Sequence, residues 1–184
     1  MLDLNFDPFP VLTTDRLVLR QKTADDVHEM FFLRSDESVM KYIDRPRAKT
    51  TADALAFIEM INGNIKNNEG ITWAITLKGK PTLIGSIGLW QIEKENYRAE
   101  LGYVLHPDHH GKGIMDEAVK AVIAYAFDIM KLHSIGATIN PENGASARVL
   151  ERNNFVREAY FRENYFFDGK FLDSAVYSLL EQKR

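Results

Sequence analysis

Stretches with the two-residue period of a strand alternate along this chain with stretches of helical spacing, and this alternation constrains the fold most. At residues 71–77, Ile, Trp, Ile and Leu occupy every second position, which is typical of a half-buried strand. Between Ala54 and Ile65, apolar residues instead recur on one face of a helix. Over the whole chain the pattern predicts the element order β-α-α-β-β-β-α-β-α-β-β.

Most of the predicted sheet is antiparallel. Residues 71–105 read as a three-strand meander, and Asp168-Gly169 is a strong signal for a hairpin near the carboxyl terminus. The only parallel crossover runs from the third meander strand, through a long helix at about 112–131, to a short strand at 134–139. We therefore expect an α/β fold: a single domain with a mixed, mostly antiparallel sheet and helices on both faces.

Composition excludes several classes of function. The 184 residues fit one domain, and the 45% that are hydrophobic supply a full core. A net charge of −3 argues against binding to nucleic acid. The absence of cysteine excludes disulfides, a thiolate nucleophile and iron–sulfur or zinc-finger sites. Because the chain has neither a membrane-spanning apolar run nor a signal peptide in MLDLNFDPFP, we expect a cytoplasmic protein without a membrane partner.

The segment from Glu100 to Met115, ELGYVLHPDHHGKGIM, carries the most chemical information. A strand ends here, a loop with two glycines follows, and a long helix begins. Free N–H groups and the dipole at a helix start attract anions, and Gly111 and Gly113 let the backbone approach a phosphate closely. Lys112 adds positive charge. On composition, a diphosphate-binding loop and a plain strand–helix turn are equally good interpretations.

The same segment, continued as ELGYVLHPDHHGKGIMDEA, resembles the acetyl-coenzyme A (acetyl-CoA) loop of the GNAT acetyltransferases. That family usually has Gln or Arg, two residues, Gly, one residue, and then Gly or Ala. In this chain His110, Gly113 and Met115 hold those three positions. The run GKGIM, followed by an acidic residue and Glu-Ala, is similar to the branch that acetylates the amino termini of ribosomal proteins, the RimJ/RimL-like group.

Two further segments, in the expected order, extend this resemblance. LTTDRLVLR at Leu12–Arg20 resembles the first strand of that branch. The segment from Asn140 to Phe155 resembles its second motif, in which NxxSxxVLEKxGF is typical. The similarity covers residues 11–180, which we expect to form a GNAT-like acetyltransferase domain behind an N-terminal extension of residues 1–10. It implies acetyl-CoA as the cosubstrate, and no set of metal ligands accompanies the histidines.

The resemblance also implies which residues hold acetyl-CoA. In the family, the pantetheine arm lies between two strands that splay apart, in the position of a missing strand. The matching segments are the third meander strand, the glycine loop with the start of the long helix, and the cap of the next helix. The implied cofactor-binding residues are Tyr103, Val104, Leu105, His110, Gly111, Lys112, Gly113, Ile114, Met115, Asn143 and Ser146.

Glu100 and Ser146 are the candidate catalytic residues. A carboxylate in a mostly apolar strand has a raised pKa when it is buried, which would make Glu100 a general base acting through water. A structural ion pair with a neighbour such as Arg98 is an equally good interpretation. The resemblance places Ser146 near the thioester sulfur, although Asn143 and Ser146 also have the spacing of a helix cap. Tyr103 is an alternative group for proton transfer.

The predicted reaction is transfer of an acetyl group from acetyl-CoA to a primary amine by direct attack on the thioester. The resemblance favours a protein or peptide amino terminus as the acceptor. The alternatives are a small amine (polyamine, amino sugar or drug), a catalytically idle acyl-CoA-binding module and an interaction protein, and a homodimer is an option for assembly. The side chains expected beside the acceptor are Tyr42, Asp44, Trp73, Trp90, Tyr97, Tyr165 and Phe167.

Overall fold

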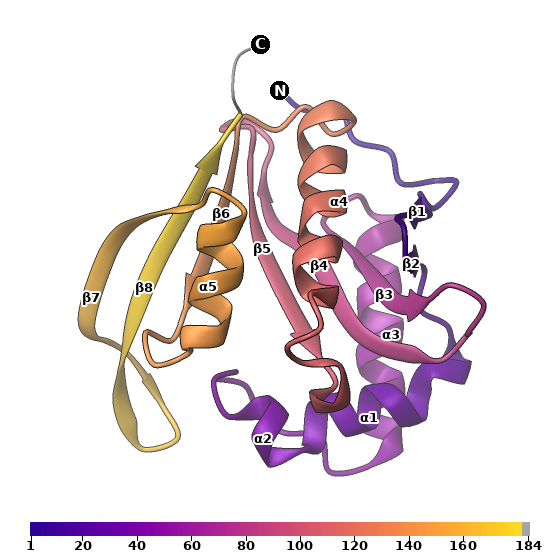
Figure 1. Ribbon diagram of the computed structural model, residues 1–184, viewed down its shortest axis with the longest axis horizontal. Helices are drawn as coiled ribbons and strands as arrows, with labels where there is room; N and C mark the ends of the chain where they lie inside the picture. Colours follow the sequence, from indigo (N-terminus) through magenta and orange to yellow (C-terminus); the bar gives the residue numbers. More distant parts are fainter. Residues whose placement is uncertain (182–184) are drawn as a thin grey trace.

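In the computed structural model, which describes residues 1–181, eight strands form one sheet (Figure 1). The order across the sheet is β1-β2-β3-β4-β5-β6-β8-β7. Neighbouring strands are antiparallel except β5 and β6, which run parallel. The strands are β1 (Leu12–Thr13), β2 (Leu17–Arg20), β3 (Ile71–Leu77), β4 (Leu83–Glu93), β5 (Arg98–Leu105), β6 (Ser134–Ile139), β7 (Val156–Phe167) and β8 (Lys170–Leu180).

Helices cover both faces of this sheet. In Figure 1, α4 and α5 lie on the near face, α3 lies behind the sheet, and α1 and α2 lie at the lower end. Within residues 1–181, none of the helices combines the length and apolarity needed to cross a bilayer. The helices are α1 (Val27–Ser35), α2 (Glu37–Met40), α3 (Thr51–Lys66), α4 (Ile114–Asp128) and α5 (Gly144–Arg152), with short 3-10 helices η1 (Ala24–Asp26) and η2 (Pro107–His109).

The structure confirms the predicted fold class. The meander, the crossover through α4 and the terminal hairpin all form, and Asp168 and Gly169 have the positive φ angles of the expected tight turn, 46° and 79°. The prediction did not include β1 or α2, which are too short to show a period. It also made the long helix too long: α4 ends at Asp128, and Ile129, which the predicted helix at about 112–131 included, is 65% exposed.

Apolar packing fixes the helices on the sheet. Val119 and Val122 of α4 are fully buried against the strands, and each such side chain contributes roughly 1.5–3 kcal/mol. A second cluster joins Leu33 of α1 to Ile58 of α3. These contacts hold the start of α4 and the end of α1 in fixed positions beside β5.

The first ten residues pack as part of the domain. Leu2, Leu4 and Phe6 are buried in the main core cluster. The fully buried Trp73 donates its indole N–H to the Pro10 carbonyl oxygen at 2.8 Å. The segment expected as an extension therefore contributes to the same core as the strands.

Lys22, just after β2, is the most unusual buried residue. Its side chain is 1% exposed, and its Nζ has no hydrogen-bond partner within residues 1–181. The nearby Asp26 carboxylate is already held by two hydrogen bonds from Arg20, at 2.7 and 2.8 Å. Burial lowers the pKa of Lys22 to about 7, against the opposing charge of Asp26.

We predict that Lys22→Met stabilises the protein most at neutral and acidic pH. The folded-state pKa of about 7 lies below the usual 10.5, so the unfolded chain binds more protons, and wild-type stability rises with pH between these values. The variant should exceed the wild type by a few kcal/mol at about pH 6, with the difference shrinking toward about pH 10. Urea unfolding at several pH values measures this. The exposed Lys66→Met is the control, and a pH-independent difference would contradict the prediction.

Candidate active site

β5 and β6 pair over only three residues and then separate. Residues 98–100 pair with residues 134–136, after which β5 continues along β4 alone and β6 continues along β8. Residues 101–105 of β5 therefore have one edge without a strand partner. This is the splayed arrangement that the sequence resemblance implied.

The free edge of β5 presents peptide groups at alternate residues. The His106 N–H donates to the Ile84 carbonyl oxygen at 2.8 Å, so the peptide groups of Val104 also face β4 in this antiparallel pair. Those of Tyr103 and Leu105 consequently face the gap. Of the three residues implied to hold the pantetheine arm, two thus offer backbone groups to the gap, and Val104 lines the adjoining cavity.

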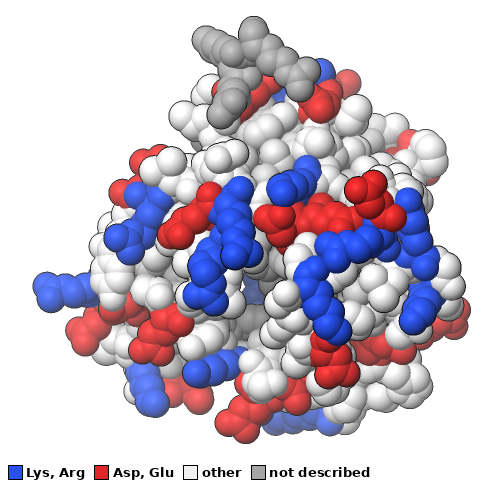
Figure 2. Space-filling view, viewed as in Figure 1, with Lys and Arg blue, Asp and Glu red and all other residues white. Residues whose placement is uncertain are grey.

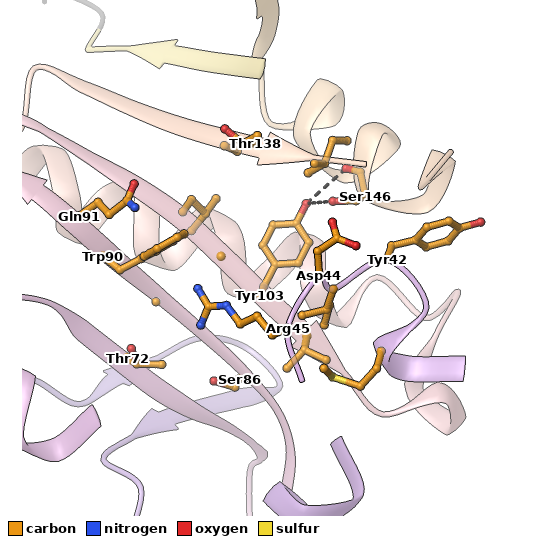
Figure 3. A pocket seen from close by; sticks show the side chains of 18 of the residues that line it. Tyr42, Asp44, Arg45, Thr72, Ser86, Trp90, Gln91, Tyr103, Thr138 and Ser146 are labelled. Carbon is orange, nitrogen blue, oxygen red and sulfur yellow. Dashed lines mark hydrogen bonds between the residues drawn. The ribbon is translucent and has the colours of Figure 1, made fainter. Parts of the chain in front are cut away.

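Tyr103 and Ser146 meet across this gap (Figure 3). The Asn143 side chain accepts a hydrogen bond from the Ser146 N–H at 3.1 Å and so caps α5, as its spacing indicated. Ser146 Oγ lies 2.8 Å from the Tyr103 hydroxyl. Burial raises the pKa of Tyr103 to about 12, although the hydrogen bond with Ser146 opposes the rise. The hydroxyl is therefore protonated at neutral pH and can donate a hydrogen bond.

The loop before α4 has the geometry of an anion site. Gly111 and Gly113 have φ angles of 71° and 72°, in the left-handed region that favours glycine. The first N–H groups of α4 lack intrahelical acceptors, as at any helix start. The His110 N–H already donates to the Pro107 carbonyl oxygen at 2.9 Å. The candidate donors to a diphosphate therefore run from Gly111 to Met115.

The side chains of His110 and Lys112 stabilise this loop. His110 Nε2 lies 3.0 Å from the Leu105 carbonyl oxygen, so the ring connects the loop to the end of β5. The Lys112 ammonium donates to the Asp108 carbonyl oxygen at 2.7 Å. The backbone N–H groups are therefore better candidates for binding an anion than these two side chains.

The sequence analysis did not predict the contacts that residues near β1 and β2 make with the start of α4 and the loop before it. Glu117, in the first turn of α4, accepts hydrogen bonds from the Thr14 hydroxyl and from the Arg16 backbone and side chain. Arg16 Nη1 also donates to the Lys112 carbonyl oxygen at 2.8 Å. Burial alone would raise the pKa of Glu117, but these hydrogen bonds outweigh it and lower the pKa. Arg16 and Glu117 are 101 residues apart, so no local pattern signals the contact.

A cavity of about 930 Å³ includes the gap and extends over the sheet toward α1, α3 and the α2–α3 loop, residues 41–50. Of the side chains expected beside the acceptor, four line the cavity, namely Tyr42, Asp44, Trp90 and Tyr165. The other three do not: Trp73 is a core residue, Tyr97 bonds to the amino terminus of the chain, and Phe167 lines a smaller depression.

A contact across the cavity joins the α2–α3 loop to β7. Asp44 Oδ2 accepts a hydrogen bond from the Tyr165 hydroxyl at 2.5 Å. Burial and this hydrogen bond both raise the pKa of Tyr165, which remains a donor. The terminal hairpin and the loop therefore enclose one side of the cavity together.

Glu100 lies where β5 and β6 separate. Its Oε1 accepts a hydrogen bond from Arg98 Nη2 at 2.9 Å on the same strand. A Cβ atom at Gly136 would lie 2.1 Å from each of these two atoms, so the ion pair covers Gly136. Burial raises the pKa of Glu100, while Arg98 opposes the rise. The ion pair expected as one interpretation is present, and the cavity wall begins one residue further, at Leu101.

The surface around the site carries charges of both signs. In Figure 2, basic and acidic side chains are interspersed over the face that carries α4 and α5, and a hollow opens near its centre. Within residues 1–181, no group of His, Asp and Glu side chains has an arrangement that could hold a metal ion. The donors for an anion are thus local to the start of α4 and are not part of a broad basic surface.

The sheet is split between β5 and β6, and the start of α4, with its free N–H groups, lies beside the split. A fold of this kind is suited to binding an acyl-CoA thioester. Residues 16–156 match the family model described as an acetyltransferase (GNAT) domain. The chain belongs to this family and is an acetyl-CoA-dependent acetyltransferase, as its motifs predicted.

Known proteins resemble the chain over nearly its whole length. The uncharacterized N-acetyltransferase YoaA of Bacillus subtilis is 32% identical, over 95% of this chain and 99% of its own. A GNAT-family acetyltransferase structure from Bacillus anthracis has 32% identity and a TM-score of 0.82, covering 93% and 98% of the two chains. The ribosomal protein uS5-alanine N-acetyltransferase of Escherichia coli is 27% identical, over 91% and 89%. These relatives are consistent with the predicted RimJ/RimL-like branch.

We predict that Gly113→Val lowers affinity for coenzyme A about tenfold or more, because the side chain obstructs the approach of a phosphate to the backbone donors. Calorimetric titration with coenzyme A measures the change. Gly79→Val is a matched control: Gly79 has a similar φ of 75° in the β3–β4 turn, so the variant suffers comparable backbone strain outside the loop before α4. Equal affinities in folded Gly113→Val and wild type would contradict this assignment of the loop.

Proposed function

We propose that this acetyltransferase modifies the α-amine of a protein or peptide amino terminus. The observation that carries the proposal is the cavity of about 930 Å³, which is continuous from the unpaired edge of β5 to α1 and α3. It offers space for several residues of an extended acceptor beside the thioester site. The similarity to an enzyme named for alanine N-acetylation of a ribosomal protein also favours an amino terminus.

In the proposed reaction, the acceptor nitrogen attacks the thioester carbonyl carbon directly. The new C–N bond forms, the C–S bond breaks, and the sulfur leaves as a thiolate. The attacking amine must first lose the proton of its ammonium form, and the thiolate must gain one. Backbone groups of Tyr103 and Leu105, which face the gap, support the extended pantetheine arm.

Tyr103 and Ser146 suit the leaving-group side of this reaction. Their hydroxyls are 2.8 Å apart and both residues line the cavity. Because the pKa of Tyr103 is raised to about 12, a proton remains on its oxygen at neutral pH. In the proposal, this pair donates a hydrogen bond to the developing thiolate, and Ser146 is the member that contacts the sulfur.

Glu100 suits the acceptor side. Its raised pKa, caused by burial, brings the carboxylate closer to the range of a useful general base. Since the cavity wall begins at Leu101, the carboxylate acts through water in this proposal. The ion pair with Arg98 then serves to orient it.

Acetyl transfer to an acceptor panel tests the proposed function. We expect coenzyme A release with peptides that have a free amino terminus, and mass spectrometry should locate the acetyl group on the α-amine. The same peptides with a blocked amino terminus are the control and should give no release. Turnover of polyamines or amino sugars without turnover of any peptide would replace this proposal with a small-amine acetyltransferase.

Glu100→Gln should lower kcat about 10²-fold at neutral pH, the usual scale for a lost general base. The loss should shrink at alkaline pH, where the amine deprotonates unaided, and affinity for coenzyme A should stay constant. Exposed Glu158→Gln, on β7, is the control. If Glu100→Gln retains normal turnover, the carboxylate is a structural partner of Arg98 and the base lies elsewhere.

A further inference from the structure

We infer that Arg34 and Arg45 form an anion-binding subsite on the acceptor side of the cavity, and that it selects acceptor amines that also carry a carboxylate. This inference rests on the proposed acetyl transfer to an amine and specifies its substrate class. It comes from two cationic side chains that line the same cavity and take part in no ion pair within residues 1–181.

Arg34 lies at the end of α1 with its guanidinium held in place. The guanidinium carbon lies 3.8 Å from the centre of the Phe57 ring, a cation–π contact that fixes its plane. Its Nε is buried and has no hydrogen-bond partner within residues 1–181. Burial and the charge of Arg45 both lower the pKa of Arg34. A buried N–H group without an acceptor is costly, and a ligand in the cavity can supply the acceptor.

Arg45 approaches the same space from the α2–α3 loop. A hydrogen bond of 2.9 Å from the Ala48 N–H to the Arg34 carbonyl oxygen holds this loop against the end of α1. The Arg45 guanidinium carbon lies 5.0 Å from the centre of the Trp90 ring. Figure 3 shows the Arg45 side chain extending through the cavity toward Trp90.

Neither arginine is neutralised by the protein. Among the ion pairs within residues 1–181, none includes Arg34 or Arg45, whereas Arg47 in the same loop lies 3.9 Å from Glu37. Two guanidinium groups near each other repel, and an anion between them relieves this repulsion. A carboxylate matches the fork of N–H donors on a guanidinium, which makes it the preferred ligand.

The cavity lining also carries acidic side chains. Asp44, which accepts a hydrogen bond from the Tyr165 hydroxyl, and Glu69 line it together with the two arginines. In the proposal these acidic groups attract the ammonium form of the acceptor, while the arginines attract its carboxylate. An acidic side chain near a peptide amino terminus and the α-carboxylate of a free amino acid both supply this chemistry.

Matched acceptors test the inference. Peptides amidated at the carboxyl terminus, with Asp or Glu following the first residue, are compared with the same peptides carrying Asn or Gln, and amino acids are compared with their carboxamides. We expect the wild type to prefer the acid in one of these pairs about tenfold or more in kcat/KM, the scale of one charge-assisted hydrogen bond. The pair of acceptors that shows the preference identifies the source of the carboxylate.

Arg45→Gln and Arg34→Gln should each reduce this preference by raising KM for the acid, with little change for the amide. Arg47→Gln, which removes a paired arginine from the same loop, is the matched control and should keep the preference. Arg45→Glu should invert it toward acceptors with a basic side chain. Because Arg34 packs on Phe57, its substitution can lower the stability of the fold, and thermal melting checks this for Arg34→Gln. If Arg34→Gln does not fold, Arg45→Gln alone tests the inference.

Equal kcat/KM for acid and amide acceptors in the wild type would overturn the inference, as would an unchanged preference in Arg45→Gln. Loss of coenzyme A affinity in these variants, measured by calorimetry, would assign the arginines to the cosubstrate instead. If no amine is acetylated, the proposed function fails, and binding decides the inference separately. Calorimetry with the enzyme–coenzyme A complex should still show tighter binding of the acidic peptide than of its amide, and equal binding would overturn the inference.

Discussion

The early separation of β5 from β6 is the feature on which the rest of the site depends. Had the parallel pairing continued, it would have satisfied the peptide groups of Tyr103 and Leu105 and filled the gap between the two halves of the sheet. Instead β6 follows β8, and α5 places Ser146 against Tyr103 across the gap. An unpaired strand edge can pair with another extended chain that carries amide groups, and pantetheine has that chemistry.

Different groups are available to bind an anion on the two sides of the gap. At the start of α4, the proposed donors to an anion are backbone N–H groups beside Gly111 and Gly113, and they do not require a broad basic surface. On the proposed acceptor side, Arg34 and Arg45 line the cavity, and neither belongs to an ion pair within residues 1–181. Among the described residues, Lys22 Nζ also has no hydrogen-bond partner, but Lys22 does not line the cavity, so its burial lowers stability without contributing to the site.

Contacts between distant parts of the chain fix the positions of these regions relative to one another. The Arg16–Glu117 pair connects the first strands to α4 and thereby fixes the glycine loop. The Tyr165–Asp44 hydrogen bond connects the terminal hairpin to the α2–α3 loop and encloses the acceptor side. The site is consequently assembled from both halves of the sheet, and the few local contacts within each segment would not suffice to position it.

Local sequence determined the elements and the loop before α4, because strand period, helix spacing, the cap at Asn143 and the glycines at 111 and 113 act over a few residues. It could not determine which aromatic side chains line the cavity. Trp73 and Trp90 look alike in sequence, yet one is a core residue and the other faces the acceptor side. Local sequence also could not predict the hydrogen-bond partners of Glu117 or the lack of a partner for Arg34 Nε within residues 1–181, because both depend on residues far away in the chain. Tertiary structure alone decides these, since burial and charge pairing are properties of space and not of sequence neighbours.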